Sequence, residues 1–160
     1  TSKDADADSI FRYVEFPERV NYVGRLDKDS TGLLLLTNDG DLANEIQRSR
    51  NNHEKEYHVR VNTDITEEFI KKMSEGVEIL DTVTKPCKVK KTGARNFSII
   101  LTQGLNRQIR RMCDALHVRV VHLKRVRIMN VRLGNLRPGE FRTLTRDEEQ
   151  ELRRLVQKRS

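Results

Sequence analysis

Several residue types and patterns are scarce in this sequence of 160 residues. It contains no tryptophan, three prolines and two cysteines, and no apolar run approaches the ~20 residues of a membrane-spanning helix. The first residues, TSKDADADSIF, are acidic and lack the basic and apolar regions of a signal peptide. Cys87 and Cys113 belong to no cysteine motif, which argues against a disulfide framework and suits a reducing cytosol. We therefore expect a cytoplasmic protein without a membrane segment.

Residue sets that bind metals or nucleotides are also missing. Cys113 and His117 are spaced i,i+4, but no second pair completes a tetrahedral zinc site, and His53 and His58 fall on different faces. Cys113 lies on the apolar stripe of a predicted helix, where an inert thiol is usual, so a Cys–His nucleophile is a weak hypothesis. No glycine-rich phosphate loop is present. The sequence predicts neither a metal nor a cofactor.

Positive charge is abundant and unevenly distributed. The formal net charge is +7, and the stretch from Arg107 to Arg132 holds eight basic residues against one acid, Asp114. This stretch alone therefore accounts for the positive surplus of the whole chain. Most charge runs are solvated faces, but concentration in one segment favours a polyanionic partner, of which nucleic acid is the commonest.

The hydrophobic pattern alternates between strands and helices within one predicted domain, residues 1–160. Period-two or continuous apolar runs predict strands, and stripes of period 3.6 predict helices. The expected strands are 32–37, 56–61, 97–104 and parts of 119–133; the expected helices are 42–49, 64–76, 106–116 and a last one from residue 145. Interleaved elements with hairpin-like strand neighbours predict an α+β (mixed α/β) fold.

Three of the predicted helices carry recognisable N-terminal signals. Asp41 is the expected cap of the first helix. Asp64 with Glu67, and Thr145 with Glu148, have the spacing of capping boxes for the second and the last.

Three polar elements are poorly explained by packing alone. Asp27 follows Arg25 directly before a buried run, Tyr57 lies on the apolar face of its strand, and Arg110 on the polar face of its helix. Taken singly, Asp27 could cap a turn and Tyr57 could be an ordinary core tyrosine. Together they suggest a carboxylate kept charged by an arginine, which is a competent nucleophile. The aromatic ring could stack on a base lifted out of RNA.

Three segments resemble the RNA pseudouridine synthases of the RsuA type. They are GRLDKDSTGLLLLTNDGDLAN, HEKEYHV and GLNRQIRRMCDAL, and LKRVRIMNVRLGNLRPGEFRTLT looks like the family's closing segment. In the family, the aspartate of the first motif is the nucleophile, which maps onto Asp27. The tyrosine of the second motif maps onto Tyr57. The arginine of the QIR core, which pairs with the nucleophile in the family, maps onto Arg110.

The resemblance covers residues 10 to 156 and implies a fold, a reaction and a substrate. The implied fold is the pseudouridine synthase catalytic fold, a largely antiparallel central sheet flanked by helices. The implied reaction isomerises a flipped-out uridine to pseudouridine with no cofactor or metal. The expected substrate is large-subunit ribosomal RNA, with transfer RNA as a further candidate, and the expected state is a monomer. Because the S4-type domain and the KP-G segment of the family are missing, the chain is expected to lack its N-terminal start.

RNA contacts are expected mainly from the basic segment. The expected RNA-binding residues are Arg25, which could fill the vacated stack, and Arg107, Gln108, Arg111, Arg119, Lys124 and Arg125. Leu123 or Ile128 could floor the pocket, although a core role is the simpler interpretation. The competing hypothesis is a catalytically silent RNA-binding or ribosome-assembly module on the same fold. A base deaminase or glycosylase is a second alternative, but a deaminase needs zinc ligands that are absent here.

Overall fold

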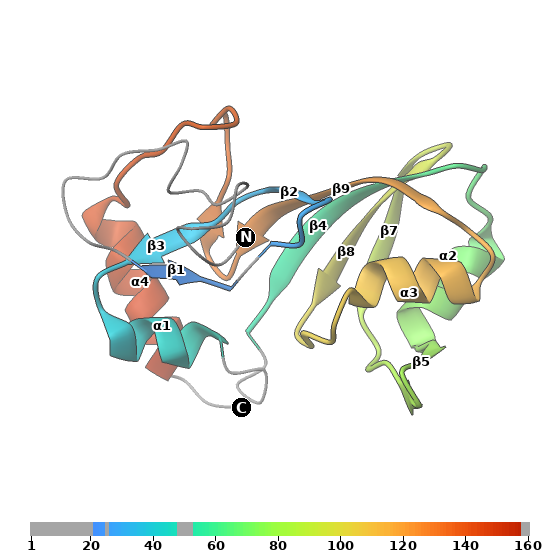
Figure 1. Ribbon diagram of the computed structural model, residues 1–160, viewed down its shortest axis with the longest axis horizontal. Coiled ribbons are helices and arrows are strands. Elements are labelled where there is room, and N and C mark those ends of the chain that lie inside the picture. Colours follow the sequence, from blue (N-terminus) through green and yellow to red (C-terminus); the bar gives the residue numbers. More distant parts are fainter. Residues whose placement is uncertain (1–20, 25, 48–52, 158–160) are drawn as a thin grey trace.

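The computed structural model describes residues 21–24, 26–47 and 53–157 (Figure 1). The strands are β1 (Asn21–Val23), β2 (Thr31–Gly32), β3 (Leu35–Thr37), β4 (Lys55–Val61), β5 (Glu78–Ile79), β6 (Thr82–Val83), β7 (Lys88–Gly93), β8 (Asn96–Leu101), β9 (Val120–Ile128) and β10 (Val131–Arg132). The helices are α1 (Gly40–Gln47), α2 (Glu67–Glu75), α3 (Gln108–Ala115) and α4 (Arg146–Gln157). None of these four helices is long and apolar enough to cross a bilayer.

The central sheet is largely antiparallel, as predicted. Its strand order is β10-β9-β4-β8-β7 with every neighbour antiparallel, and β2 adds to β9 as a parallel strand. Two small antiparallel pairs, β1 with β3 and β5 with β6, lie outside it. The α+β prediction is confirmed.

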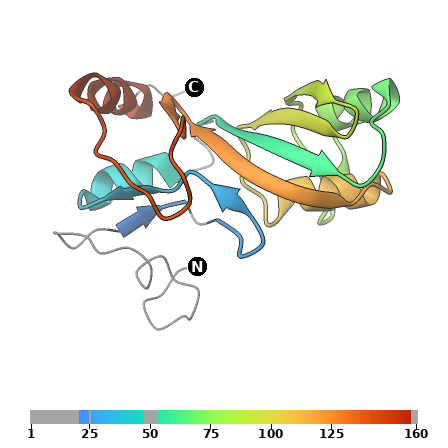
Figure 2. The same ribbon diagram turned by 90° about the horizontal axis from the view of Figure 1, so that it is seen from above.

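Two hydrophobic cores lie at opposite ends of the molecule, and β9 runs between them (Figures 1 and 2). The first lies between α2, α3 and the central sheet and includes Met73, Phe97, Ile99 and Met112. The second joins α1 and α4 to β1 and β3 and includes Val23, Ile46, Leu152 and Val156. Strand β9 contributes Leu123 to the first core and Ile128 to the second. Both residues are buried, which agrees with the core role considered for them.

The predicted strand over residues 32–37 is interrupted in the structure. Its start, β2, pairs with β9, whereas its end, β3, pairs with β1 in a different sheet. Gly32 has a φ of +114°, a backbone conformation that glycine adopts readily, and it marks where the chain leaves β9. Leu33 and Leu35 are buried, so the burial predicted from the apolar run is correct. The prediction of one continuous strand is wrong.

The capping box predicted for the last helix is present. The backbone N–H of Glu148 donates to Thr145 Oγ1 at 3.1 Å, and the N–H of Thr145 donates to Glu148 Oε1 at 2.9 Å. Arg142 donates two further bonds to the same carboxylate, at 2.7 Å each. The hydrogen bonds from Arg142 lower the pKa of the Glu148 carboxyl to about 2.

The caps predicted for the first two helices, Asp41 and Asp64, are each wrong by two residues. Helix α1 begins at Gly40, so Asp39 rather than Asp41 accepts the N–H of Leu42 at 3.1 Å. Helix α2 begins at Glu67, and Thr66 accepts the N–H of Phe69 at 3.0 Å. A side chain caps a helix only from the position immediately before the first helical residue. Asp64 lies too early for this and instead forms an ion pair with Arg95.

Candidate active site

The loop between β1 and β2 carries Asp27 and lies beside β9 and the start of α3. A turn closes within it, because the N–H of Ser30 donates to the carbonyl of Asp27 at 2.9 Å. Glycines flank the loop, Gly24 with φ +68° and Gly32 with φ +114°. These two positions let the chain reverse sharply while both loop ends stay attached to the sheets. The Asp27 side chain is 36% exposed, so it is both accessible and partly shielded from water.

Arg125 on β9 anchors both ends of this loop. Its Nη2 donates to the carbonyl of Gly24 at 2.9 Å, and its Nε donates to the carbonyl of Leu33 at 2.9 Å. Its own carbonyl accepts the N–H of Leu33 at 2.7 Å. At 2% exposure, the residue is fully enclosed by these contacts. A buried guanidinium that bonds two backbone carbonyls fixes the loop far more firmly than a surface arginine would.

Tyr57 lies directly across from Arg125 in the pairing of β4 with β9. Burial lowers the pKa of the Arg125 guanidinium, while the neighbouring Tyr57 and the charge of Asp27 act in the opposite direction. Burial, and then the proximity of Arg125, lower the pKa of Lys55, two residues before Tyr57 on the same strand. Tyr57 and Asp27, the aromatic residue and the carboxylate predicted for the site, therefore both lie near Arg125.

Arg107 and Arg110 at the start of α3 face the loop. Arg107 forms a two-point ion pair with Asp29, with Nη1–Oδ1 and Nη2–Oδ2 distances of 3.0 and 2.8 Å. Its Nη1 also lies 3.9 Å from Asp27 Oδ2. Arg110 Nη2 donates to the carbonyl of Asp29 at 2.7 Å, and its Nε lies 3.4 Å from Asp29 Oδ2. Among the described residues, the arginine within ion-pair distance of Asp27 is thus Arg107, whereas the family resemblance predicts Arg110.

The backbone at the start of α3 is unusual. Arg107, the residue before the helix, has φ +48° and ψ +40°, a left-handed conformation that costs about 1–3 kcal/mol for a residue with a side chain. Its contacts with the two aspartates compensate in part. The hydrogen bonds from Arg107 also hold the pKa of the Asp29 carboxyl below its ordinary value.

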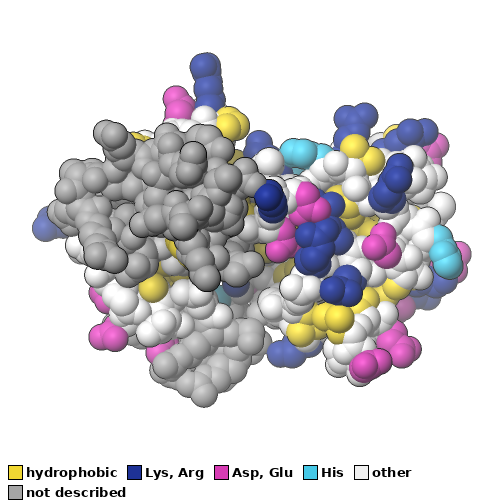
Figure 3. Space-filling view, viewed as in Figure 1, with side chains coloured by type: hydrophobic (Ala, Val, Ile, Leu, Met, Phe, Trp, Pro, Cys, Tyr) yellow, Lys and Arg dark blue, Asp and Glu magenta, His cyan; other side chains and the backbone are white. Residues whose placement is uncertain are grey.

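Two buried polar atoms beside the loop have no hydrogen-bond partner among the residues that the structure describes. They are Ser30 Oγ, in the turn that carries Asp27, and Arg110 Nε. Buried polar atoms are nearly always paired, so unpaired ones at a site are candidates for contacting a ligand. Figure 3 shows acidic and basic side chains gathered side by side in the middle of this face.

Two residues expected to bind RNA are buried. Arg125 bonds the backbone of the Asp27 loop and is 2% exposed, and Gln108 is 4% exposed. The Gln108 side chain accepts the N–H of Leu105 at 3.2 Å and donates to Gln103 Oε1 at 3.2 Å. Neither can contact an RNA phosphate from this position. Both are corrected to roles inside the protein, where they hold the loop before β2 and the loop before α3.

The basic segment 107–132 does not form one surface. Arg107 and Arg111 are exposed at α3, and Arg111 donates to the side chain and carbonyl of Asn106. Arg119 is exposed at the start of β9, and Lys124 points to the other face of the sheet from Arg125 because successive strand residues alternate. Arg127 is paired with Glu54 and Glu56. Arg25 lies outside the described residues. The sequence did contain a signal for the burial of Arg125. Because strand residues alternate between faces, Arg125 points to the same side of β9 as the buried Leu123.

The match to known proteins agrees with this fold and shows the family of the chain. Residues 3–115 match the family described as RNA pseudouridylate synthase, and the chain belongs to that family. It is 54% identical over 160 residues to the dual-specificity RNA pseudouridine synthase RluF of Escherichia coli (strain K12), covering 100% of this chain and 55% of that protein. It is 34% identical over 150 residues to the ribosomal large subunit pseudouridine synthase B of Bacillus subtilis (strain 168), covering 90% of this chain and 62% of that protein.

A solved structure shares the fold closely. The crystal structure of a pseudouridylate synthase superposes with a TM-score of 0.84 at 32% identity, covering 92% of this chain and 65% of that one. The chain spans about half the length of the RluF proteins that it matches.

Proposed function

We propose that this protein isomerises a uridine in RNA to pseudouridine with Asp27 as the nucleophile. The observation that carries the proposal is the position of Asp27: partly exposed, 3.9 Å from the Arg107 guanidinium, on a loop anchored by a buried arginine. Membership of the pseudouridylate synthase family supports the reaction type.

The proposed reaction rearranges one glycosidic bond and conserves every atom. Asp27 attacks either C1′ of the ribose or the uracil ring, and the bond from N1 to C1′ breaks. The freed uracil turns within the site and bonds to C1′ through C5, and the bond from the Asp27 carboxylate to C1′ or to the ring breaks, which regenerates the free carboxylate. The proton on C5 leaves and N1 gains one, so the product is an isomer of the substrate. No redox partner or energy source is required.

Neighbouring residues have distinct proposed roles. Tyr57 stacks on the uracil and is a candidate to accept the C5 proton. It lies opposite Arg125, the buried arginine that also holds the Asp27 loop. Arg107 holds the Asp27 carboxylate in place by its charge. Arg110 fixes the loop backbone at Asp29, and its Nε lies within ion-pair distance of the Asp29 carboxylate.

RNA binding must offset the cost of lifting the base from its stack, which is a few kcal/mol. The exposed Arg107 and Arg111 at the start of α3 are next to the site and are proposed to contact phosphates. Sequence-independent contacts of this kind supply affinity and leave the choice of uridine to other features of the RNA.

We infer that the target lies in large-subunit ribosomal RNA and that the protein belongs to the RsuA type within its family. The three motifs support the type, and a relative named for the ribosomal large subunit supports the target. Transfer RNA is proposed as a further substrate, in keeping with the dual specificity in the name of RluF.

Release of tritium from RNA that contains 5-tritiated uridine tests the proposal, because isomerisation expels the hydrogen on C5. The proposal predicts release from ribosomal RNA that still lacks this pseudouridine. RNA binding without release would identify a catalytically silent binding module instead.

A further inference from the structure

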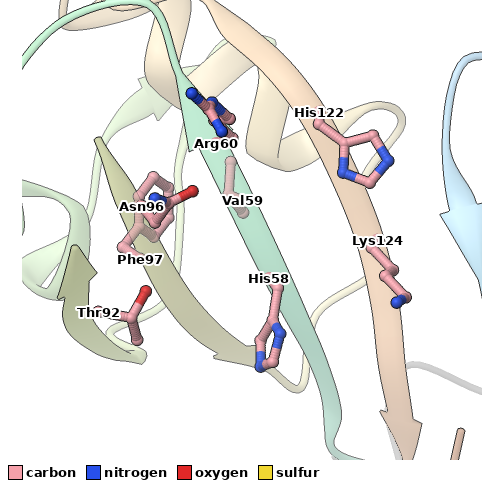
Figure 4. Close-up of a pocket in the computed structure, with 8 residues that line it drawn as sticks. All are labelled: His58, Val59, Arg60, Thr92, Asn96, Phe97, His122 and Lys124. Carbon is pink, nitrogen blue, oxygen red and sulfur yellow. The ribbon is translucent and has the colours of Figure 1, made fainter. Parts of the chain in front are cut away.

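The central sheet carries a basic surface on the side away from α2 and α3. It is formed by alternate residues of neighbouring strands and is called here the outer sheet face: His58 and Arg60 of β4, Asn96 of β8, and His122 and Lys124 of β9 (Figure 4). The residues between them, such as Val59, Phe97 and Leu123, point to the opposite side and belong to the first core.

The strand register places basic side chains directly opposite one another on this face. His58 faces Lys124 and Arg60 faces His122 in the pairing of β4 with β9. Arg60 and Lys124 are thus each opposed by a histidine and not by a carboxylate, although oppositely charged pairs would be the stabilising choice in a sheet. A sequence that departs from a local rule in this way commonly does so at a binding site.

Carboxylates among the described residues do not compensate this charge. Glu56 is the acidic residue two positions before His58 on the same side of β4, and Arg127 already holds it at 3.0 Å. Lys90 on β7 adds another exposed cation, because it faces Ser98, which in turn faces His58. The cationic side chains of lysine and arginine offer only hydrogen-bond donors, so the complementary ligand is an anion rich in acceptors.

The face is hollowed between these side chains. A depression with a volume of about 360 Å³ is lined by His58, Arg60, Thr92, Asn96, His122 and Lys124. Amide and hydroxyl groups therefore lie beside the cations, a mixture suited to phosphate and ribose oxygens together.

The loop that carries Asp27 connects the active site to this face around the edge of β9. Thr31, four residues after Asp27, pairs with Lys124, and its Oγ1 lies 3.3 Å from His122 Nε2. An extended RNA strand that leaves the active site beside this short loop would therefore reach the outer sheet face.

We propose that the outer sheet face binds the sugar-phosphate backbone of a second segment of the substrate RNA, one that flanks the segment in the active site. This inference rests on the proposed function for the identity of the RNA. It assigns binding to residues outside the family motifs, among them Arg60, Asn96 and His122.

The test compares the double variant Arg60→Ala/Lys124→Ala with Lys71→Ala/Lys85→Ala, which removes the same charge from exposed positions elsewhere. Equilibrium binding is measured across salt concentrations with two RNAs, a stem-loop containing the target uridine and the same stem-loop with single-stranded flanks. We expect the first variant to bind the flanked RNA about tenfold less tightly, with a shallower salt dependence by about one to two phosphate contacts. The bare stem-loop should bind as it does to the control.

Equal binding of the flanked RNA by both variants would overturn the proposal, as would an equal loss for both RNAs. Thermal unfolding separates these outcomes from misfolding, because removing two cations that face no carboxylate across the strands should leave the melting temperature unchanged or slightly higher. Binding requires no turnover, so failure of isomerisation by the wild-type protein would contradict the proposed function and leave the binding result to be judged independently.

Discussion

The buried guanidinium of Arg125 donates to the carbonyl of Gly24, 101 residues earlier in the chain, at 2.9 Å. A second bond to the carbonyl of Leu33 means that one side chain holds both ends of the loop that presents Asp27. The position of the Asp27 carboxylate, the proposed nucleophile, therefore depends on Arg125 of β9.

Replacing Arg125 with lysine should impair turnover more than RNA affinity. Lysine keeps the charge but cannot reproduce two donors in a rigid fork, so at least one buried carbonyl loses its partner. We expect a loss of about 1–3 kcal/mol in the free energy of unfolding and a fall of about tenfold in kcat. The conservative change Arg132→Lys, at the exposed residue of β10, is the control. A purely structural role would lower the melting temperature and leave kcat of the folded fraction intact, contrary to this account.

The close approach of β2 to β9 requires glycine at position 32. A Cβ added there would lie 2.1 Å from the carbonyl oxygen of Arg125, which is backbone and cannot swing aside. Gly134 offers a matched control, since it also has positive φ but no atom within 4 Å of an added Cβ. In urea unfolding, Gly134→Ala should cost about 1 kcal/mol and Gly32→Ala clearly more. Similar costs for the two variants would show that the loop can leave β9 freely.

The ion pair of Arg107 with Asp29 should stabilise the protein in a pH-dependent way. Because the pKa of Asp29 is lowered in the folded state, its contribution is present above the ordinary carboxyl pKa and is lost as pH falls through the lowered one. Arg107→Gln should therefore lower the melting temperature slightly near pH 7, and the difference should vanish in acid. A difference that persists after the carboxylate is protonated would indicate that the left-handed backbone of Arg107, rather than the ion pair, is responsible.

Neither cysteine should react under native conditions. Burial raises the pKa of the Cys113 thiol to about 12 and that of Cys87 to about 11. At pH 8, iodoacetamide should modify both only after unfolding in urea, since the thiolate is the reactive form. Mass spectrometry of the native protein provides the measurement. Rapid alkylation of Cys113 in the native protein would instead support the hypothesis of a Cys–His nucleophile, which the position of Cys113 on the apolar stripe argues against.

Much of the fold could be predicted from residue patterns, because burial leaves a clear period in the sequence. The stripe of Ile109, Met112 and Cys113 marked α3, and the alternation of Phe97 and Ile99 marked β8, as the structure confirms. The break in the strand at residues 32–37 was not predictable, because it depends on how closely β9 approaches, and β9 lies about 90 residues further along the chain.

The sequence could suggest candidate residues for the site, but it could not predict how they pair. Asp27 and Asp29 are two residues apart on one turn, and only the folded loop determines which carboxylate meets which arginine. The function of Arg125 was missed for a different reason. A charged residue within a basic run suggests a surface, and only the alternation from Leu123 indicates that it points inward.

The rate of tritium release by Asp27→Asn, measured against Asp29→Asn, tests the central claim most directly. The two substitutions remove one carboxylate each from the same turn, and both replacements are nearly isosteric. If Asp27 is the nucleophile, its variant should bind RNA nearly as tightly as the wild type while release falls by about 10³-fold or more. The Asp29 variant, which loses only its ion pairs with Arg107 and Arg110, should retain measurable release. Release by Asp27→Asn at a rate equal to or above that of Asp29→Asn would contradict the account.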